Sequence, residues 1–249
     1  MPEVLLKIKD LKKSFGGVRA VDRCSFHVEK GRMTALIGPN GAGKTTVFNL
    51  ISGFIKSEGG NIEFRGERID RLAAHQRARR GIARTFQQVR LFQNLSLAAN
   101  IQLAAETEDY SFWKSVILGT GHEGKERTKE ALDAVGLESA PETLSSALSF
   151  GQQKLLETAR ALAFPHQLLM LDEPVAGVAP HLRERIAALL RTLKAAGETI
   201  LAIEHDMDFV MRTADHVIVM DEGRVIAEGA PADIQRHPDV LDAYLGEQL

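Results

Sequence analysis

The stretch GPNGAGKT, residues 38–45, decides the fold of this chain. It matches the pattern G-x-x-x-x-G-K-[ST] at every fixed position. Residues 33–37 before it are apolar and partly β-branched, as in a buried strand, and residues 46–52 after it lack Gly and Pro and can form a helix. Strand, glycine turn and helix in this order make a phosphate-binding loop, so we expect the chain to bind a nucleoside triphosphate.

The parts of this loop have separate chemical tasks. Its glycines let successive backbone N–H groups point inward, and the N-terminus of the following helix adds a partial positive charge. We expect Lys44 to reach the β- and γ-phosphates and the Thr45 hydroxyl to bind Mg²⁺. The expected nucleotide-binding residues of the loop are Gly38, Pro39, Asn40, Gly41, Ala42, Gly43, Lys44, Thr45 and Thr46.

The composition is that of an ordinary globular protein. Of the 249 residues, 44% are hydrophobic and 26% are charged, and the formal net charge of −2 argues against nucleic acid as a partner. The single cysteine, Cys24, excludes an internal disulfide and suits a core position in a reducing compartment. The basic residues Arg77, Arg79 and Arg80 are expected on a solvated helix face rather than on an RNA-binding surface.

The chain shows no cleavable leader, and no apolar run reaches the roughly 18–20 residues that span a bilayer. We therefore expect a cytoplasmic protein that cannot form a membrane pore by itself.

Apolar runs and turn residues divide the chain into three parts. Up to about residue 90 strands and turns prevail, residues 91–149 are mainly helical with a loop at 119–124, and strands and helices then alternate again. Further strands are expected at residues 4–8, 24–28, 61–64, 82–86, 168–171, 199–203 and 216–220. Further helices are expected at residues 72–80, 95–105, 112–118, 125–135, 153–163 and 181–196.

Two carboxylates follow the apolar strand at residues 168–171. Asp172 and Glu173 stand at its C-terminal end, where an open parallel sheet presents its ligand-binding groups. We expect Asp172 to hold Mg²⁺, directly or through water, and Glu173 to orient and deprotonate an attacking water. Acidic residues often end a strand, so the pair alone is a weak signal. In combination with the phosphate-binding loop it indicates a site of nucleoside triphosphate hydrolysis.

Residues 148–152, LSFGQ, precede a predicted helix, and Ser149 stands where the N-cap of that helix would be. The stretch also resembles LSGGQ, the signature of the ATP-binding subunits of ABC transporters, with Phe150 in place of the first glycine. The resemblance implies that Ser149, Gly151 and Gln152 bind the γ-phosphate of an ATP held by the other subunit of a dimer. An aromatic residue at position 150 is usual in the branched-chain amino-acid type of this family.

Other elements of that family follow in the expected order. Phe15 stands where an aromatic ring stacks on adenine. Gln87 matches the Q-loop, which would sense the γ-phosphate and Mg²⁺, with the neighbouring Gln88 as the alternative. His205 matches the switch histidine that contacts the γ-phosphate. The D-loop position is at residues 176–180. Ala179 departs from the family, which carries a polar Asp there, so contacts across the dimer at this position would have to come from the backbone.

The resemblance covers nearly the whole chain. It implies an α/β fold, a P-loop NTPase core of the ABC ATPase kind with an N-terminal antiparallel β subdomain and an inserted α-helical subdomain. Residues 1–249 would form a single ABC ATPase domain, with a RecA-like core and β subdomain at 1–90 and 150–249 and the helical insert at 91–149. The implied catalytic residues are Glu173, His205, Lys44 and Gln87, and the implied Mg²⁺ ligands are Thr45, Gln87 and Asp172.

The implied activity is ATP hydrolysis coupled to transport of a branched-chain or similar hydrophobic amino acid, with ATP and Mg²⁺ as cofactors. The expected partners are a second ATPase subunit, identical or paralogous, integral membrane permease subunits and, indirectly, a periplasmic or extracellular solute-binding protein. This expectation places the chain on the inner face of the cell membrane. Export of lipid or lipopolysaccharide, import of another solute, a soluble ABC ATPase of translation or DNA repair, and a small-molecule kinase are the alternatives.

Overall fold

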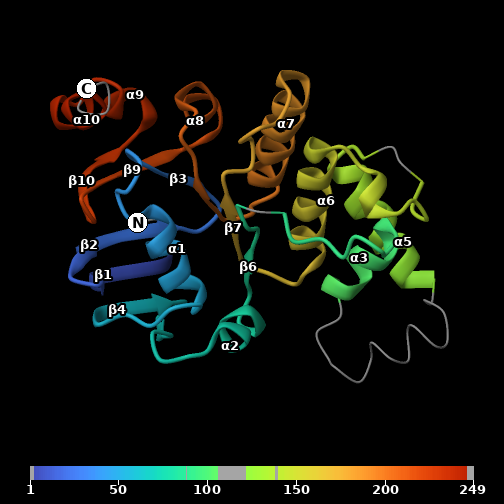
Figure 1. Ribbon diagram of the computed structural model, residues 1–249, viewed down its shortest axis with the longest axis horizontal. Coiled ribbons are helices and arrows are strands. Elements are labelled where there is room, and N and C mark those ends of the chain that lie inside the picture. The colour runs from blue at the N-terminus through green and yellow to red at the C-terminus, as the bar shows by residue number, and fades with distance from the viewer. Residues whose placement is uncertain (1–2, 88, 106–121, 138–139, 246–249) are drawn as a thin grey trace.

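Two β-sheets of different kinds organise the chain (Figure 1). The structure is a computed structural model that describes residues 3–87, 89–105, 122–137 and 140–245. The antiparallel sheet has the order β2-β1-β4-β5 and comprises β1 (Val4–Phe15), β2 (Val18–Glu29), β4 (Gly59–Phe64) and β5 (Glu67–Arg68). The six-stranded sheet has the order β10-β9-β3-β8-β7-β6 and comprises β3 (Met33–Ile37), β6 (Ile82–Arg84), β7 (Leu168–Asp172), β8 (Ile200–Ile203), β9 (His216–Asp221) and β10 (Arg224–Gly229).

The central strands of the six-stranded sheet are parallel and apolar on both faces. Every residue of β3, β7 and β8 is buried, which is typical of a parallel sheet covered on both sides. Leu36 of β3 and Asp172 of β7 both pair with Ile203 of β8, and Arg84 of β6 pairs with Met170 of β7. Because these strands run in one direction, the loops that follow them leave the sheet at the same edge.

The helices cover the sheets and build a lobe at one end of the molecule (Figure 1). In that lobe α3, α5 and α6 contact one another, and Leu97, Ile101, Leu132 and Leu155 lie in one buried cluster. α1 packs against both sheets in a second cluster that contains Phe48. The helices are α1 (Lys44–Ser52), α2 (Ala74–Arg79), α3 (Leu97–Ala105), α5 (His122–Ala134), α6 (Phe150–Ala163), α7 (Pro180–Ala195), α8 (Met207–Thr213), α9 (Pro231–Ile234) and α10 (Pro238–Leu245).

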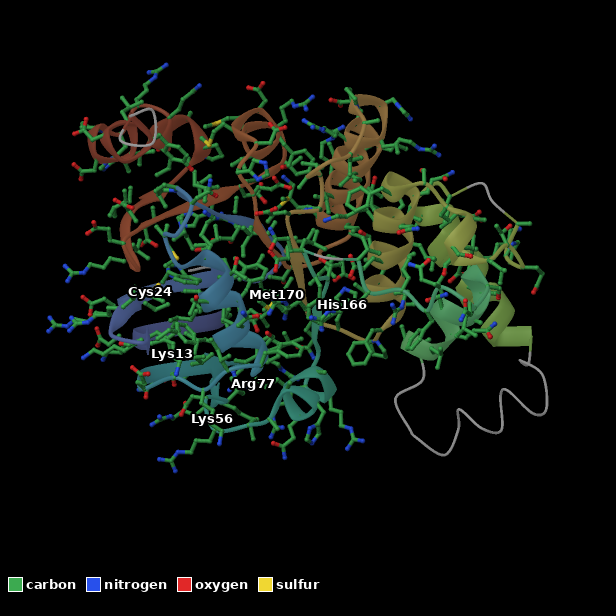
Figure 2. The ribbon with its side chains drawn as sticks, in the orientation of Figure 1. Lys13, Cys24, Lys56, Arg77, His166 and Met170 are labelled. Carbon is green, nitrogen blue, oxygen red and sulfur yellow. The ribbon has the colours of Figure 1, made fainter. Side chains whose placement is uncertain are left out.

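These elements confirm the predicted α/β fold with its antiparallel sheet and helical lobe, whereas the exact division at residues 90 and 150 stays a prediction. The tail helix α10 docks on its own domain, since Val240 is buried in a cluster with Val217 and Val219 of β9. Cys24 is buried in β2 (Figure 2), and burial raises the pKa of its thiol to about 12, so it is a core residue as expected. Within the described ranges, no helix is both long and apolar enough to cross a membrane.

Two helices begin earlier than predicted. The helix expected from residue 153 begins at Phe150, because Ser149 already supplies the cap of its first turn. α5 begins at His122, inside the loop predicted at residues 119–124. Its packing against α6 outweighs the low helix propensity of the glycine within it. The helix predicted at 112–118 lies outside the described residues.

The antiparallel strands are longer than predicted. The strand expected at residues 4–8 continues to Phe15, because a register shift between Ile8 and Leu11 breaks the regular alternation of apolar residues. The strand expected at residues 24–28 is the second half of β2, which begins at Val18 and pairs with β1. β10, α8 and α9 were not predicted, since each is short and lacks a strong apolar period.

The prediction of a solvated face at residues 77–80 was wrong for Arg77. Its side chain, labelled in Figure 2, is 2% exposed, and its guanidinium donates to the carbonyls of Leu50 at 2.5 Å and Ile51 at 2.9 Å, in the last turn of α1. It also donates to the carbonyls of Asp70 and Leu72. A helix leaves its last carbonyls without partners inside the helix, so Arg77 completes the C-terminus of α1, the helix that begins at the glycine loop.

Replacing Arg77 by Met should therefore lower the free energy of unfolding by about 2–4 kcal/mol, because buried carbonyls lose a charged donor. Urea unfolding monitored by circular dichroism measures this. The exposed neighbour Arg79 provides the matched control, and Arg79→Met should stay within about 0.5 kcal/mol of the parent. Equal values for the two variants would contradict the capping role.

A second buried charge, Glu204, joins two loops at the edge of the parallel sheet. Its carboxylate is fully buried and accepts hydrogen bonds from the backbone N–H groups of Val175 and His205, both at 3.2 Å. Burial raises the pKa of Glu204 to about 7, although these hydrogen bonds act in the opposite direction. The folded protein therefore retains this proton to a higher pH than the unfolded chain does.

This difference in pKa predicts that Glu204 destabilises the fold as the pH rises from 4.5, its ordinary pKa, to about 7. The loss in the free energy of unfolding should reach about 3 kcal/mol. Glu204→Gln cannot titrate, so its free energy of unfolding should rise relative to the parent across this window and stay level above it. Urea unfolding between pH 4.5 and 8 measures the difference, with the exposed Glu142→Gln as control. A difference that does not change with pH would contradict the assignment.

Candidate functional site

The glycine loop between β3 and α1 needs its glycines for steric reasons. Gly38 has a φ of +143° and Gly43 a φ of +95°, a region that side chains rarely adopt. A Cβ atom at Gly38 would lie 2.0 Å from the carbonyl oxygen of Met220, and one at Gly43 would lie 2.2 Å from that of Ala20. The first turn of α1 holds no acidic residue and Gly43 provides no side-chain cap, so its N–H groups remain directed at the loop.

Lys44 and Thr45 begin α1, directly after the glycine loop. Lys44 is buried at the start of α1, and its ammonium donates to the carbonyl oxygens of Gly38 at 2.6 Å and Pro39 at 2.7 Å. Thr45 is exposed beside it and Thr46 is half-buried. The loop thus combines backbone donors, a lysine ammonium and a surface hydroxyl, which is the donor set that phosphate and its metal require.

Asp172 stands at the end of β7, where the sequence predicts a metal ligand. Its Oδ2 pairs with the guanidinium of Arg84 at 2.9 Å, and its buried Oδ1 has no hydrogen-bond partner in the part of the chain that the structure describes. Burial raises the pKa of the Asp172 carboxyl, and the hydrogen bond and charge of Arg84 oppose this shift. A buried carboxylate oxygen without a partner fits a hard divalent cation such as Mg²⁺.

Sequence reasoning missed Arg84. Its guanidinium also donates to Asn49 at 2.8 Å and Ser52 at 2.7 Å, both in α1, and it lies over the ring of Phe86. Arg84 therefore links the helix of the glycine loop to the acidic end of β7. An isolated arginine at a strand end carries no sequence signal, since its partners lie far away in the chain.

Glu173 and Gln87 meet at this edge of the sheet. The Glu173 carboxylate accepts a hydrogen bond from the Gln87 side-chain amide at 3.3 Å. The Glu173 backbone has a φ of +50°, and its N–H donates to the carbonyl of Ile203 at 3.1 Å. The alternative Q-loop residue, Gln88, lies outside the described residues.

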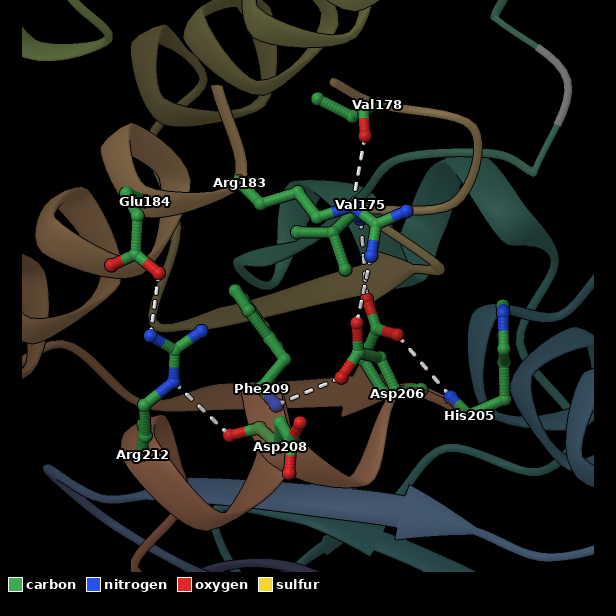
Figure 3. A network of polar contacts seen from close by, with 10 residues as sticks. Val175, Val178, Arg183, Glu184, His205, Asp206, Asp208, Phe209 and Arg212 are labelled. Carbon is green, nitrogen blue, oxygen red and sulfur yellow. Dashed lines mark hydrogen bonds and ion pairs between the residues drawn. The ribbon is translucent and has the colours of Figure 1, made fainter. Parts of the chain in front are cut away.

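His205 follows β8, the strand between β3 and β7, and its side chain is exposed. Its backbone is held by Glu204, and the next residue, Asp206, accepts from the N–H of Phe209 at 3.0 Å and caps α8 (Figure 3). Asp206 also pairs with Arg183, whose guanidinium donates to the carbonyl of Val178 at 2.8 Å. This pair gives the D-loop a backbone contact, whereas Ala179 offers no side-chain cap to α7.

The signature residues form a second region. Ser149 caps α6, since its Oγ accepts from the N–H of Gln152 at 3.4 Å while the Gln152 side chain accepts from the N–H of Ser149 at 3.0 Å. A Cβ atom at Gly151 would lie 2.6 Å from Cδ1 of Leu182, so a larger residue there would require the Leu182 side chain to move. These residues line a hollow of about 620 Å³ together with residues of the D-loop and α7, and none of the glycine loop lines it.

Phe15, the expected adenine-stacking residue, ends β1 and is 48% exposed, with the Lys13 ammonium 5.2 Å from its ring centroid. About half of the side chain is therefore accessible to an aromatic ligand.

Two further residues that sequence reasoning missed lie on α6. Glu157 is buried and accepts from the N–H groups of Phe86 and Arg90, both at 3.3 Å, on either side of Gln87. Lys154 is buried and donates to the carbonyl of Glu173 at 2.9 Å. Opposite charges three residues apart in the predicted helix were the available signal.

Comparison with known proteins agrees with this geometry. The family described as ABC transporter matches residues 21–176, and the family described as Branched-chain amino acid ATP-binding cassette transporter matches residues 224–249. The high-affinity branched-chain amino acid transport ATP-binding protein BraF of Pseudomonas aeruginosa is 38% identical over 254 residues, covering 99% of this chain and 100% of BraF. The corresponding protein LivG of Salmonella typhimurium is 39% identical with the same coverage.

Among solved structures, the ADP conformation of an ATP-binding cassette of an ABC transporter superposes with a TM-score of 0.86 and 33% identity, covering 98% of this chain and 99% of that one. Both the sequence and the fold are therefore shared over nearly the full length. The chain belongs to the family of ATP-binding subunits of ABC transporters.

Proposed function

We propose that this chain is the ATP-hydrolysing subunit of a transporter that imports branched-chain or similar hydrophobic amino acids. The names of its relatives BraF and LivG support the substrate class, because both are branched-chain amino acid transport proteins. ATP binding and hydrolysis follow from membership of the family.

The separation of two groups of residues carries the proposed mechanism. One group lies at the ends of adjacent strands at one sheet edge and comprises Lys44, Asp172, Glu173 and His205. Ser149 lies apart from it, in the hollow beside α7. A complete site would form when the signature of one subunit faces the glycine loop of another, so two subunits would enclose two ATP molecules. Contacts that exist only in the closed dimer favour closure, and hydrolysis removes them.

Thr45, Gln87 and Asp172 would hold Mg²⁺, which would neutralise charge on the β- and γ-phosphates. Glu173 would accept a proton from water as the water oxygen attacks the γ-phosphorus and the bond to the bridging oxygen of ADP breaks. Lys44 and His205 would stabilise the negative charge of the transferred group, and Phe15 would stack on adenine. Ser149, Gly151 and Gln152 would contact the γ-phosphate from the partner.

The proposal includes membrane partners. A second ATPase subunit, identical or paralogous, and integral permease subunits would complete the transporter, which would place this chain on the inner face of the cell membrane. A soluble ABC ATPase is the second candidate, and co-purification with ribosomes instead of permeases would favour it. A kinase would transfer phosphate to an acceptor, so release of free phosphate without one excludes it.

Glu173→Gln should bind ATP normally but hydrolyse it about 10²–10⁴-fold more slowly, because the amide cannot accept the proton from water. Phosphate release measures turnover, and a fluorescent ATP analogue measures binding. Glu222→Gln provides the control, since Glu222 is an exposed glutamate with a similar positive φ of 44° in a turn. Near-normal turnover of Glu173→Gln would remove this residue from the role of general base.

Ser149→Arg should leave ATP binding by one subunit intact but prevent ATP-driven dimerisation, because the large cation blocks the signature face. Size-exclusion chromatography with ATP in the Glu173→Gln background measures this. The lost cap costs about 1 kcal/mol, so circular dichroism should still report a folded protein. The exposed Ser146→Arg, which lies outside the signature, should dimerise normally. A dimer formed by Ser149→Arg would contradict the role in trans.

A further inference from the structure

One buried cation beneath the site has no task in the mechanism above. Lys154 lies on α6, five residues after the exposed Ser149, and is 4% exposed. Its ammonium donates to the backbone carbonyl of Glu173 at 2.9 Å and lies 6.0 Å from the ring centroid of Phe150. The side chain thus joins the helix of the signature to the residue proposed as general base.

Space filling does not explain this lysine. Among the described residues, no carboxylate oxygen lies within the 4.0 Å that defines an ion pair with its ammonium. A buried ammonium is costly, and an apolar side chain of the same length would fill the volume. Its charge acts at longer range on the buried carboxylates of Glu157 and Asp172, and its direct hydrogen bond goes to the Glu173 backbone.

The contacted residue has a strained backbone. Glu173 has a φ of +50°, in the left-handed region that residues other than glycine rarely adopt. Its N–H is held by Ile203, and its carbonyl accepts both from Lys154 and from the N–H of Ala176 at 3.2 Å. This conformation directs the carboxylate toward Gln87 instead of along the strand.

We propose that Lys154 is a positioning residue that holds the Glu173 backbone in this left-handed conformation and so keeps its carboxylate at the place of the attacking water. The inference rests on the proposed role of Glu173. It also gives α6 a second task, because the helix that presents the signature to a partner subunit then fixes the base of its own site.

Lys154→Met tests the proposal, because methionine keeps the length and removes the donor. The turnover number for ATP should fall about 10- to 100-fold, as expected for a misplaced reacting group, while KM and ATP binding stay unchanged. The urea midpoint reports the balance between loss of this donor and removal of a buried charge, so turnover, KM and ATP binding are the readouts that test the proposal. Lys154→Arg retains a donor and should restore most of the turnover.

Lys194→Met is the matched control. Lys194 also donates to a backbone carbonyl, that of Thr213 at 3.3 Å, and pairs with Asp215 at 2.9 Å, away from the site. Its replacement should leave turnover unchanged. Parent-like turnover of Lys154→Met, or a loss matched by Lys194→Met, would overturn the proposal.

The Glu173→Gln background separates action through Glu173 from other effects. If Lys154 acts only by placing that carboxylate, Lys154→Met should change single-turnover hydrolysis by less than about twofold in this background. ATP-driven dimerisation of the double variant should be retained. A further large loss, or failure to dimerise, would show that Lys154 acts through the signature and would overturn the proposal. Near-normal turnover of Glu173→Gln alone would instead refute the role of Glu173 in the proposed function.

Discussion

The parallel pairing of β6, β7, β8 and β3 is the constraint on which the rest of the structure depends. β3, β7 and β8 are buried, and Leu36 and Asp172 both pair with Ile203, so the segments after these strands share one edge of the sheet. The glycine loop, the Asp172-Glu173 pair, His205 and Gln87 come from distant parts of the sequence. The order of the strands, and not hydrogen bonding between these segments, brings most of them together.

Buried charged side chains then hold the individual segments. Arg84 neutralises one oxygen of Asp172 and bonds to α1, and Glu157 holds the backbone on both sides of Gln87. Glu204 joins the segments after β7 and β8 in the same way. The carboxyl groups of Glu157 and Glu204 replace the regular hydrogen bonds that loops lack, since loop N–H groups still need partners when they are buried.

Residues with local sequence signals were predicted well. The strand before the glycine loop was predicted with its observed bounds, and the acidic pair was placed at the end of β7, because each depends on neighbours in the chain. Arg77 and Arg84 were missed for the opposite reason. Both look like surface arginines, and only tertiary packing surrounds them with carbonyls and aromatic rings. Helix starts were also displaced when a cap such as Ser149 outweighed an apolar period.

The geometry of α6 restricts the length of the chain as well as its residues. Ser149 caps the first turn of α6, whereas Lys154 and Glu157 on the same helix hold two other segments, at Glu173 and on either side of Gln87. Each residue of a helix turns the next by about 100°, so one inserted or deleted residue would rotate every later contact away from its partner. Substitutions here can be compensated by neighbours, but a change in length cannot. The number of residues between these contacts is therefore as important for the site as the identity of the residues that make them.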